Sequence, residues 1–295
     1  MEMRALGGIG VLIVILPLLY VYSCSVAQTR FPTVRNKRIC LLIAHPDDEA
    51  MFFSPTVLAL TRPETGNHVK ILCLSTGNAD GLGETRKREL VKSAMLLGLR
   101  QEDDVFVIDD PNFPDSMTTP WDPQKISSLL SSAFAPYLLR PNSPSSANPA
   151  ASIDVLVTFD AQGISSHPNH ISLHHGAKRF LAALTAGKPG FSSPVDLYTL
   201  TTVNVLRKYT TFLDMFATML EVVLAGGEGR KKNGKGNPGM LVSMSTLFGG
   251  RESAATARQA MTEAHKSQMV WFRWGWISMS RYMVINTLRM EKSKP

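Results

Sequence analysis

Residues 44–49, with the sequence AHPDDE, could hold a divalent metal ion. They place a histidine and three carboxylates directly after a strand-like run. Adjacent carboxylates repel one another, so burying them in a folded protein calls for a cation. His45 and Asp48 lie three residues apart on a turn and can both point at one ion, while Asp47 projects elsewhere. The alternative is a solvated loop in which Asp48 serves as the N-cap of a helix.

A second stretch, residues 166–170 (SHPNH), carries two more potential ligands, His167 and His170. It follows another strand-like run, and in open α/β sheets ligands bind at the carboxyl ends of strands. Two histidines and one carboxylate with an open position are typical of a catalytic rather than a structural zinc site. Either stretch alone would also suit a solvated turn, but the two together favour a metal site.

Strand-like and helix-like runs alternate along the chain and predict a mostly parallel sheet with helices on both faces. The predicted strands cover residues 38–44, 69–75, 105–109, 153–159 and 197–205. The predicted helices cover residues 48–60, 84–99 and 122–139, with Asp122 as an N-cap, and another helix begins near Asn169. This fold class would bring the two histidine-rich stretches to the same edge of the sheet.

The motifs resemble those of the PIG-L/LmbE family of zinc-dependent de-N-acetylases, and most of all its eukaryotic branch. AHPDDE after a strand and the later HPNH carry the resemblance. Residues 74–81 and 83–89 are similar to the G-N-x-x-G and G-x-x-R-x-x-E blocks of the family, and residues 265–273 to the C-terminal signature of the eukaryotic branch. The resemblance spans roughly residues 38–290 and implies a Rossmann-like α/β fold.

The resemblance also implies a role for each matching residue. His45, Asp48 and His170 match the zinc ligands, although iron or manganese could occupy such a set. Asp47 matches the general base that takes the proton of the attacking water, and His167 the group that stabilises the oxyanion and can protonate the leaving amine. Arg86 matches an arginine near the substrate, and its guanidinium suits contact with a phosphodiester.

By the same resemblance, the expected substrate is a glycolipid, N-acetylglucosaminyl-phosphatidylinositol. Hydrolysis of its N-acetyl group is an early step of glycosylphosphatidylinositol-anchor biosynthesis at the endoplasmic reticulum. The net charge of +7 would suit such an anionic lipid, whereas no zinc finger, helix-turn-helix or RNA-binding signature points to nucleic acid. Two alternatives stay open: a de-N-acetylase of soluble amino-sugar conjugates, and a scaffold without activity.

Residues 5–22 are uncharged and mostly apolar, which predicts a single N-terminal transmembrane helix. Four cations follow this segment and one precedes it, so the catalytic domain is expected to face the cytosol. A cleavable signal peptide is the alternative, because residues 25–27 have the small-x-small form of a cleavage site. The expected organisation is an anchor at residues 1–29 and a catalytic domain at residues 30–295, with mobile loops near residues 141–149 and 226–239.

Other polar residues allow two interpretations each. His174 follows His170 by four residues and could form an HxxxH zinc pair, but a histidine on a helix surface is favoured. Asp160 either orients an active-site histidine or closes a turn. Arg88 is expected to be solvated, and Glu89 could pair with Arg86 across the helix surface.

The segment of residues 269–288 is rich in aromatic residues and allows two interpretations as well. Its two arginines argue against a helix that spans the lipid. It could lie on the membrane surface, where tryptophan and arginine are favoured, or pack on the catalytic domain.

Overall fold

The computed structural model describes residues 2–139, 148–226, 232–247 and 249–291 of the chain. Its centre is a seven-stranded sheet in the order β3-β2-β1-β4-β5-β7-β6. The strands are β1 (Arg38–Ile43), β2 (His68–Cys73), β3 (Val105–Val107), β4 (Val155–Phe159), β5 (Asp196–Leu200), β6 (Met240–Met244) and β7 (Ile285–Met290). The first five run parallel, and β7 pairs antiparallel with both β5 and β6.

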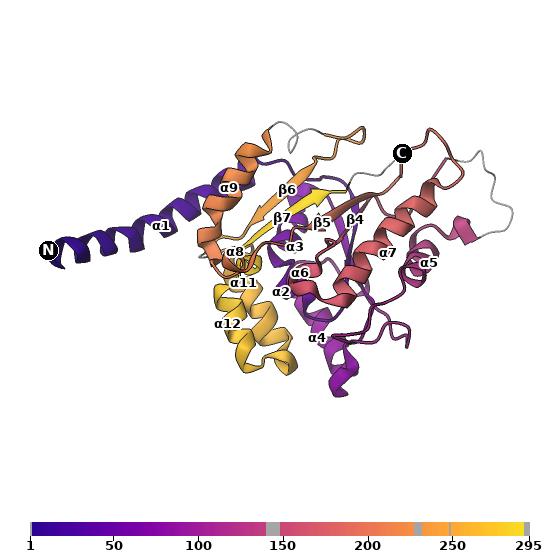
Figure 1. The fold of residues 1–295 in the computed structure, drawn as a ribbon, viewed down its shortest axis with the longest axis horizontal. Coiled ribbons are helices and arrows are strands. Elements are labelled where there is room, and N and C mark those ends of the chain that lie inside the picture. The colour runs from indigo at the N-terminus through magenta and orange to yellow at the C-terminus, as the bar shows by residue number, and fades with distance from the viewer. Residues whose placement is uncertain (1, 140–147, 227–231, 248, 292–295) are drawn as a thin grey trace.

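The helices alternate with the parallel strands. They are α1 (Glu2–Arg30), α2 (Asp48–Met51), α3 (Ser54–Leu60), α4 (Gly83–Leu96), α5 (Pro123–Phe134), α6 (Gly163–Ser166), α7 (Pro168–Thr185), α8 (Val205–Lys208), α9 (Met215–Leu224), α11 (Ala254–Gln259) and α12 (Trp271–Met279). Single turns that matter below are η5 (Thr211–Asp214), η6 (Ala260–Ala264) and η8 (Arg281–Met283). Right-handed crossovers place α3 and α4 on one face of the sheet and α5 and α7 on the other (Figure 1). The prediction of a mostly parallel, Rossmann-like α/β fold is confirmed.

The central strands are apolar along their whole length because both faces of the sheet are covered. All of β4 and β5 is buried, and so is β1 after its first residue. The edge formed by β6 and β7 was not predicted. In β7 the polar Asn286 is buried against the α3 side, where its side-chain oxygen accepts a hydrogen bond of 2.8 Å from Thr56 Oγ1. Because Asn286 interrupts the run of apolar residues, the hydrophobic pattern of the sequence does not identify this strand.

Several predicted elements differ from the structure in continuity or length. The helix expected at residues 48–60 is divided into α2 and α3, because Pro55 has no N–H to continue the helix that begins at Asp48. The strand expected at residues 197–205 ends at Leu200, and α8 begins at Val205. Asp122 is the N-cap of α5 as predicted, since its carboxylate accepts a hydrogen bond of 2.8 Å from Gln124 N.

The N-terminal segment folds as the long helix α1, which projects from the body of the protein (Figure 1). In the part of the chain that the structure describes, no helix combines the length and the apolar character needed to cross a membrane. The transmembrane helix expected at residues 5–22 therefore gains no support. Tyr20, which lies within this segment, is fully buried, and its hydroxyl donates to Ser245 O (2.8 Å).

The strand order creates a switch point between β1 and β4. The chain leaves β1 toward β2 on one side and leaves β4 toward β5 on the other, so the two carboxyl ends lie side by side with diverging loops. In open α/β sheets, this is where ligands bind. Residues 44–49 follow β1, and residues 166–170 follow β4 after the short helix α6. The fold thus brings residues 44–49 and residues 166–170 together.

Candidate metal-dependent active site

The turn after β1 is closed by the side chain of Asp48. Its Oδ2 accepts hydrogen bonds from the backbone N–H groups of Ala44 and His45, both at 2.9 Å. The turn holds Asp47 at φ 129°, a conformation that non-glycine residues seldom adopt. Such strain persists only where the surrounding structure enforces it, and it is concentrated at functional sites. Asp47 and Asp48 therefore point in different directions although they are adjacent.

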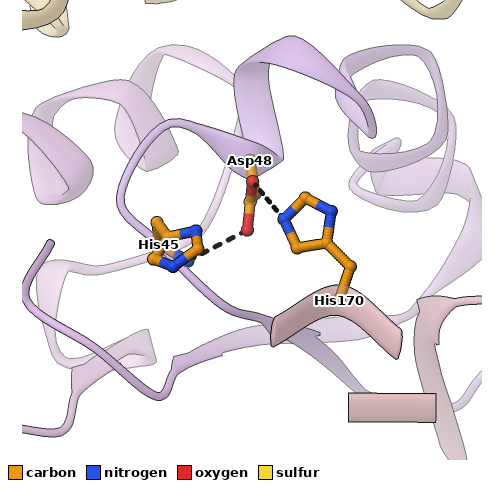
Figure 2. A group of neighbouring side chains, drawn as sticks. All are labelled: His45, Asp48 and His170. Atoms are coloured by element: carbon orange, nitrogen blue, oxygen red, sulfur yellow. Dashed lines mark hydrogen bonds and ion pairs between the residues drawn. The ribbon is translucent and has the colours of Figure 1, made fainter. Parts of the chain in front are cut away.

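His45, Asp48 and His170 form a buried group whose potential ligand atoms all lie within 4.8 Å of one another. His170 comes from the first turn of α7, and its Nε2 lies 3.2 Å from Asp48 Oδ1 (Figure 2). The other ring nitrogen, Nδ1, lies 2.9 Å from Gly163 O. A histidine that donates Nδ1–H to a backbone carbonyl presents the lone pair of Nε2, which is the usual arrangement of a metal ligand.

His45 is oriented by Asn169. The Asn169 Nδ2 donates to Thr119 O (2.9 Å), so its Oδ1 is the atom that faces His45 Nε2 at 3.1 Å. An acceptor there makes Nε2 the protonated nitrogen of His45 and leaves Nδ1 with a free lone pair. Both histidines are therefore held in a tautomer suited to binding a metal.

The charge state of Asp48 also suits a metal. Burial by itself would raise the pKa of Asp48, but His170, His45 and the His45 backbone N–H favour the ionised form, and its net pKa lies well below the usual range. The buried Nε2 of His170 has no hydrogen-bond partner among the described residues, since its contact with Asp48 lacks the required geometry. An anionic oxygen and two imidazole nitrogens, one of which is buried without a hydrogen-bond partner, together fit a divalent metal such as zinc.

His167 lies beside the group formed by His45, Asp48 and His170. It is the N-cap of α7, and its Nδ1 accepts a hydrogen bond of 3.2 Å from Asn169 N. Its ring centroid lies 5.1 Å from that of His45 and 4.6 Å from that of His170. Burial, together with the two neighbouring imidazoles, lowers the pKa of His167 to about 4. The ring is therefore neutral at pH 7 and carries its hydrogen on Nε2, ready to donate a hydrogen bond.

Asp47 is almost fully buried and contacts two guanidinium groups. Arg273, from α12, donates to Asp47 Oδ2, and Arg86 Nη2 lies 3.8 Å from the same oxygen. Arg273 was not identified as a site residue from the sequence, because it lies more than 220 positions further along the chain and its surroundings are aromatic. Arg273 belongs to residues 265–273, and the similarity of this stretch to the C-terminal signature of the family is the sequence feature that points to it.

A second ligand-like group also contains His45 and was not predicted. Asp115, in the loop after β3, places its Oδ1 3.3 Å from His45 Nε2 and its Oδ2 3.3 Å from Arg86 Nη1. The potential ligand atoms of His45, Asp115 and His167 also lie within 4.8 Å of one another, but Asp115 and His167 are only half-buried. Because Asn169 Oδ1 is the hydrogen-bond partner of His45 Nε2 and Asp115 Oδ1 lies 3.3 Å from the same nitrogen, we assign Asp115 to orientation of His45 and Arg86 rather than to the metal.

The buried Glu49 carboxylate connects the backbone of Asp47 to two other side chains. Its Oε2 accepts from the backbone N–H of Asp47 (3.2 Å), and its Oε1 lies 2.6 Å from His265 Nε2 and accepts from Ser93 Oγ. Glu49 and His265 are both fully buried. This pair ties residues 44–49 to the C-terminal part of the chain and supports the strained conformation of Asp47.

Asp160 and His174, for which the sequence allowed a role at the active site, have structural roles. Asp160 closes a turn by accepting from Gln162 N and Gly163 N, and among the described residues no hydrogen bond or ion pair joins it to a histidine. His174 is buried rather than on the helix surface, and its Nε2 lies 3.3 Å from Glu291 Oε1. The HxxxH zinc pair is therefore not formed.

The residues of α4 are also placed. Glu89 does not pair with Arg86 but accepts from Ser267 N (2.8 Å) and Ser267 Oγ (2.7 Å). Arg88 is exposed, as expected. Arg86 donates to Gly77 O (2.6 Å) and Pro46 O (3.1 Å), so it connects the loop after β2 with the loop that carries Asp47.

A cavity of about 330 Å³ opens next to these residues. It lies between the loop after β2 and the loop after β3, and Asp115 is part of its wall. The lining residues are Ser75, Thr76, Asn78, Ala79, Ile108, Asp109, Asp110, Pro111, Phe113, Pro114 and Asp115. A cavity of this size, with serine, threonine, asparagine and aspartate side chains among its lining, can receive a sugar-sized part of a substrate.

Comparison with known proteins shows which family the chain belongs to. Residues 40–181 match the family model described as PIG-L, GlcNAc-PI de-N-acetylase. The N-acetylglucosaminyl-phosphatidylinositol de-N-acetylase of Arthroderma benhamiae is 51% identical, covering 88% of this chain and 89% of that protein. The proteins of the same name from Bos taurus and Saccharomyces cerevisiae are 34% and 32% identical and cover 86% and 93% of this chain, and 83% and 91% of their own lengths. This chain belongs to the PIG-L family of N-acetylglucosaminyl-phosphatidylinositol de-N-acetylases.

Proposed function

We propose that this protein is a hydrolase that removes the N-acetyl group of N-acetylglucosaminyl-phosphatidylinositol. The products are acetate and glucosaminyl-phosphatidylinositol, and the reaction belongs to glycosylphosphatidylinositol-anchor biosynthesis. The observation that carries the proposal is the meeting of His45, Asp48 and His170 with Asp47 and His167 at one strand-end site. The relatives that match most of the chain bear the name of this activity.

The proposed metal is zinc, held by His45, Asp48 and His170. A bound zinc ion lowers the pKa of a water molecule and polarises an amide carbonyl. Asp47 then accepts the proton of the attacking water while the water oxygen bonds to the acetamide carbon. The Nε2–H of His167 donates a hydrogen bond to the carbonyl oxygen as negative charge develops there.

The amine must gain a proton when its C–N bond breaks. Neutral His167 can donate a hydrogen bond but would become an unfavourable anion if it lost that proton. The lowered pKa of His167 therefore supports Asp47 as the group that returns the proton to the nitrogen. This modifies the role suggested by the resemblance, in which His167 could protonate the leaving amine.

We expect metal removal to abolish this activity reversibly. Purified protein would be incubated with N-acetylglucosaminyl-phosphatidylinositol, and released acetate measured, before and after treatment with a chelator. Activity should disappear with the metal and return when zinc is added, because the ligand set binds a divalent ion. Iron and manganese, added separately, test which metal supports turnover best. Full activity in a protein shown to contain no metal would contradict the proposal.

Arg86 is proposed to bind the phosphodiester of the substrate. It contacts Asp115 in the wall of the cavity, and its buried Nε has no hydrogen-bond partner among the described residues. We expect Arg86→Lys to lower kcat/KM for the glycolipid by about 10- to 100-fold, the usual value of a charge-assisted contact. On an uncharged N-acetylglucosamine conjugate the loss should be clearly smaller, because that substrate lacks the phosphodiester.

Arg88→Lys is the matched control for this prediction, because Arg88 lies two residues away on α4 and is exposed. It should leave both reactions unchanged. Equal losses on the charged and uncharged substrates in Arg86→Lys would show that Arg86 acts by holding the two loops and would remove the phosphate role.

The site of action is proposed to be the cytosolic face of the endoplasmic reticulum membrane. The relatives are named for a lipid substrate, and the basic residues between positions 30 and 38 would suit an anionic lipid surface. Protease treatment of intact microsomes tests this orientation. Digestion of the region that carries α7 without detergent supports it, and full protection contradicts it.

A further inference from the structure

Exposed apolar side chains are concentrated on one part of the surface. Among the described residues, all but four of the exposed large apolar side chains lie on α1, on the segment from α8 to α9, or at α12. The four exceptions are Leu82, Phe106, Met117 and Phe191. We name the exposed residues of the second and third groups the apolar face: Val205, Leu206, Tyr209, Leu213, Phe216, Leu220, Val223, Leu224, Val270, Trp271, Phe272, Trp274 and Met279.

These elements adjoin one another. Tyr209, after α8, contacts Trp276 of α12 with ring centroids 6.0 Å apart, and Lys208 Nζ lies 5.2 Å from the Trp276 ring. Phe212 of η5 contacts Tyr20 of α1 at 5.7 Å. In Figure 1, α9, α8 and α12 follow one another along the side of the protein from which α1 projects. The apolar face is therefore one surface, built from segments far apart in the sequence.

The two longer helices of this face expose no free charge. The one charged residue of α9, Glu221, is paired with Arg207. The one charged residue of α12, Arg273, turns inward to Asp47. A surface helix in contact with water normally carries charged residues on its outer side. Exposed apolar areas of this extent mark sites of contact with a protein or a membrane.

The apolar face is also attached to the active site. Arg273 of α12 contacts Asp47, and Trp276 Nε1 donates to Met51 O at 3.1 Å, one turn after Asp48. The apolar face therefore adjoins the turn that carries Asp47, where the substrate would be hydrolysed. On the proposed function, that substrate has acyl chains embedded in a bilayer.

We propose that the apolar face docks on a lipid bilayer, with its side chains in the boundary between headgroups and acyl chains. Docking in this position presents the active site to the headgroup of a lipid that stays in the membrane. Exposed tryptophans such as Trp271 and Trp274 suit this boundary, since the indole ring is amphipathic. This inference rests on the proposed function only for the identity of the lipid substrate.

The test compares two double variants of the full chain. Leu220→Gln with Val223→Gln alters the apolar face at exposed positions of α9, and Phe106→Gln with Phe191→Gln alters exposed apolar residues elsewhere. Trp271→Gln tests α12 independently. Binding to vesicles of phosphatidylcholine and phosphatidylinositol would be measured by flotation. Hydrolysis would be measured on vesicle-embedded glycolipid and on a soluble N-acetylglucosamine conjugate.

The α9 double variant and Trp271→Gln should each lose vesicle binding and vesicle activity, the double variant by at least about tenfold. Both should keep wild-type activity on the soluble conjugate, which also shows that they fold. The Phe106/Phe191 variant should match wild type throughout. Unchanged vesicle binding and vesicle activity in both face variants would overturn the proposal, as would loss of a bound protein partner with unchanged vesicle binding. A wild-type protein that binds vesicles but hydrolyses neither substrate would instead refute the proposed function.

Discussion

Asp47→Asn is expected to lower turnover by roughly 10²–10⁴ while leaving the metal content close to that of wild type. The amide has nearly the same size as the carboxylate and can still contact Arg273 and Arg86, but it cannot accept the proton of water. The ligand group does not include Asp47, whose side chain is directed away from Asp48 by its unusual backbone conformation. The variant should therefore bind metal and fail in catalysis.

Asp48→Ala and His170→Ala are the matched comparisons. Each removes one of the three proposed ligands and should empty the site or severely weaken metal binding. His167→Ala should resemble Asp47→Asn, with metal retained and turnover reduced, because its Nε2–H is assigned to the oxyanion. Atomic absorption on the four purified variants, beside acetate release, distinguishes the two classes. Metal loss in Asp47→Asn, or metal retention in Asp48→Ala, would overturn the assignment of roles.

The sequence predicts the centre of this site because its chemistry is local. Two short motifs follow strands that an apolar pattern identifies, and the switch point of a parallel sheet brings such strand ends together. His45, Asp48, His170, Asp47 and His167 could all be placed in this way. Their mutual distances and the acceptors that set the histidine tautomers, Gly163 O and Asn169 Oδ1, became visible only in the structure.

The parts that could not be predicted depend on long-range packing. Asp115 lies in an irregular loop, and His265 and Arg273 come from a C-terminal segment that reaches the site through α12 and η6. Aromatic residues in that segment permitted either a membrane surface or a packed position. The structure shows a packed and an exposed position within α12, since Trp276 packs on Phe52 while Trp271 is 85% exposed. No local pattern separates two such tryptophans on one helix.

His265→Ala is expected to lower the free energy of unfolding by about 3–5 kcal/mol, which is the cost of removing one partner of a buried charged pair. Both side chains are completely buried, and His265 Nε2 lies 2.6 Å from Glu49 Oε1. Truncation would leave the Glu49 carboxylate without this donor and open a cavity beside it. Denaturant unfolding of the purified protein, with an unchanged m-value, measures the loss.

His175→Ala is the matched control, because His175 is exposed on α7 and its replacement should change stability by less than about 0.5 kcal/mol. The double variant Glu49→Gln/His265→Ala separates charge from packing. If the unpaired carboxylate causes the loss, the double variant should be more stable than His265→Ala alone, whereas a purely packing effect would make the two changes additive. The backbone conformation of Asp47 depends on the same pair, since Glu49 accepts a hydrogen bond from the backbone N–H of Asp47. A His265→Ala protein as stable as His175→Ala would show that the buried pair does not hold the catalytic turn in place.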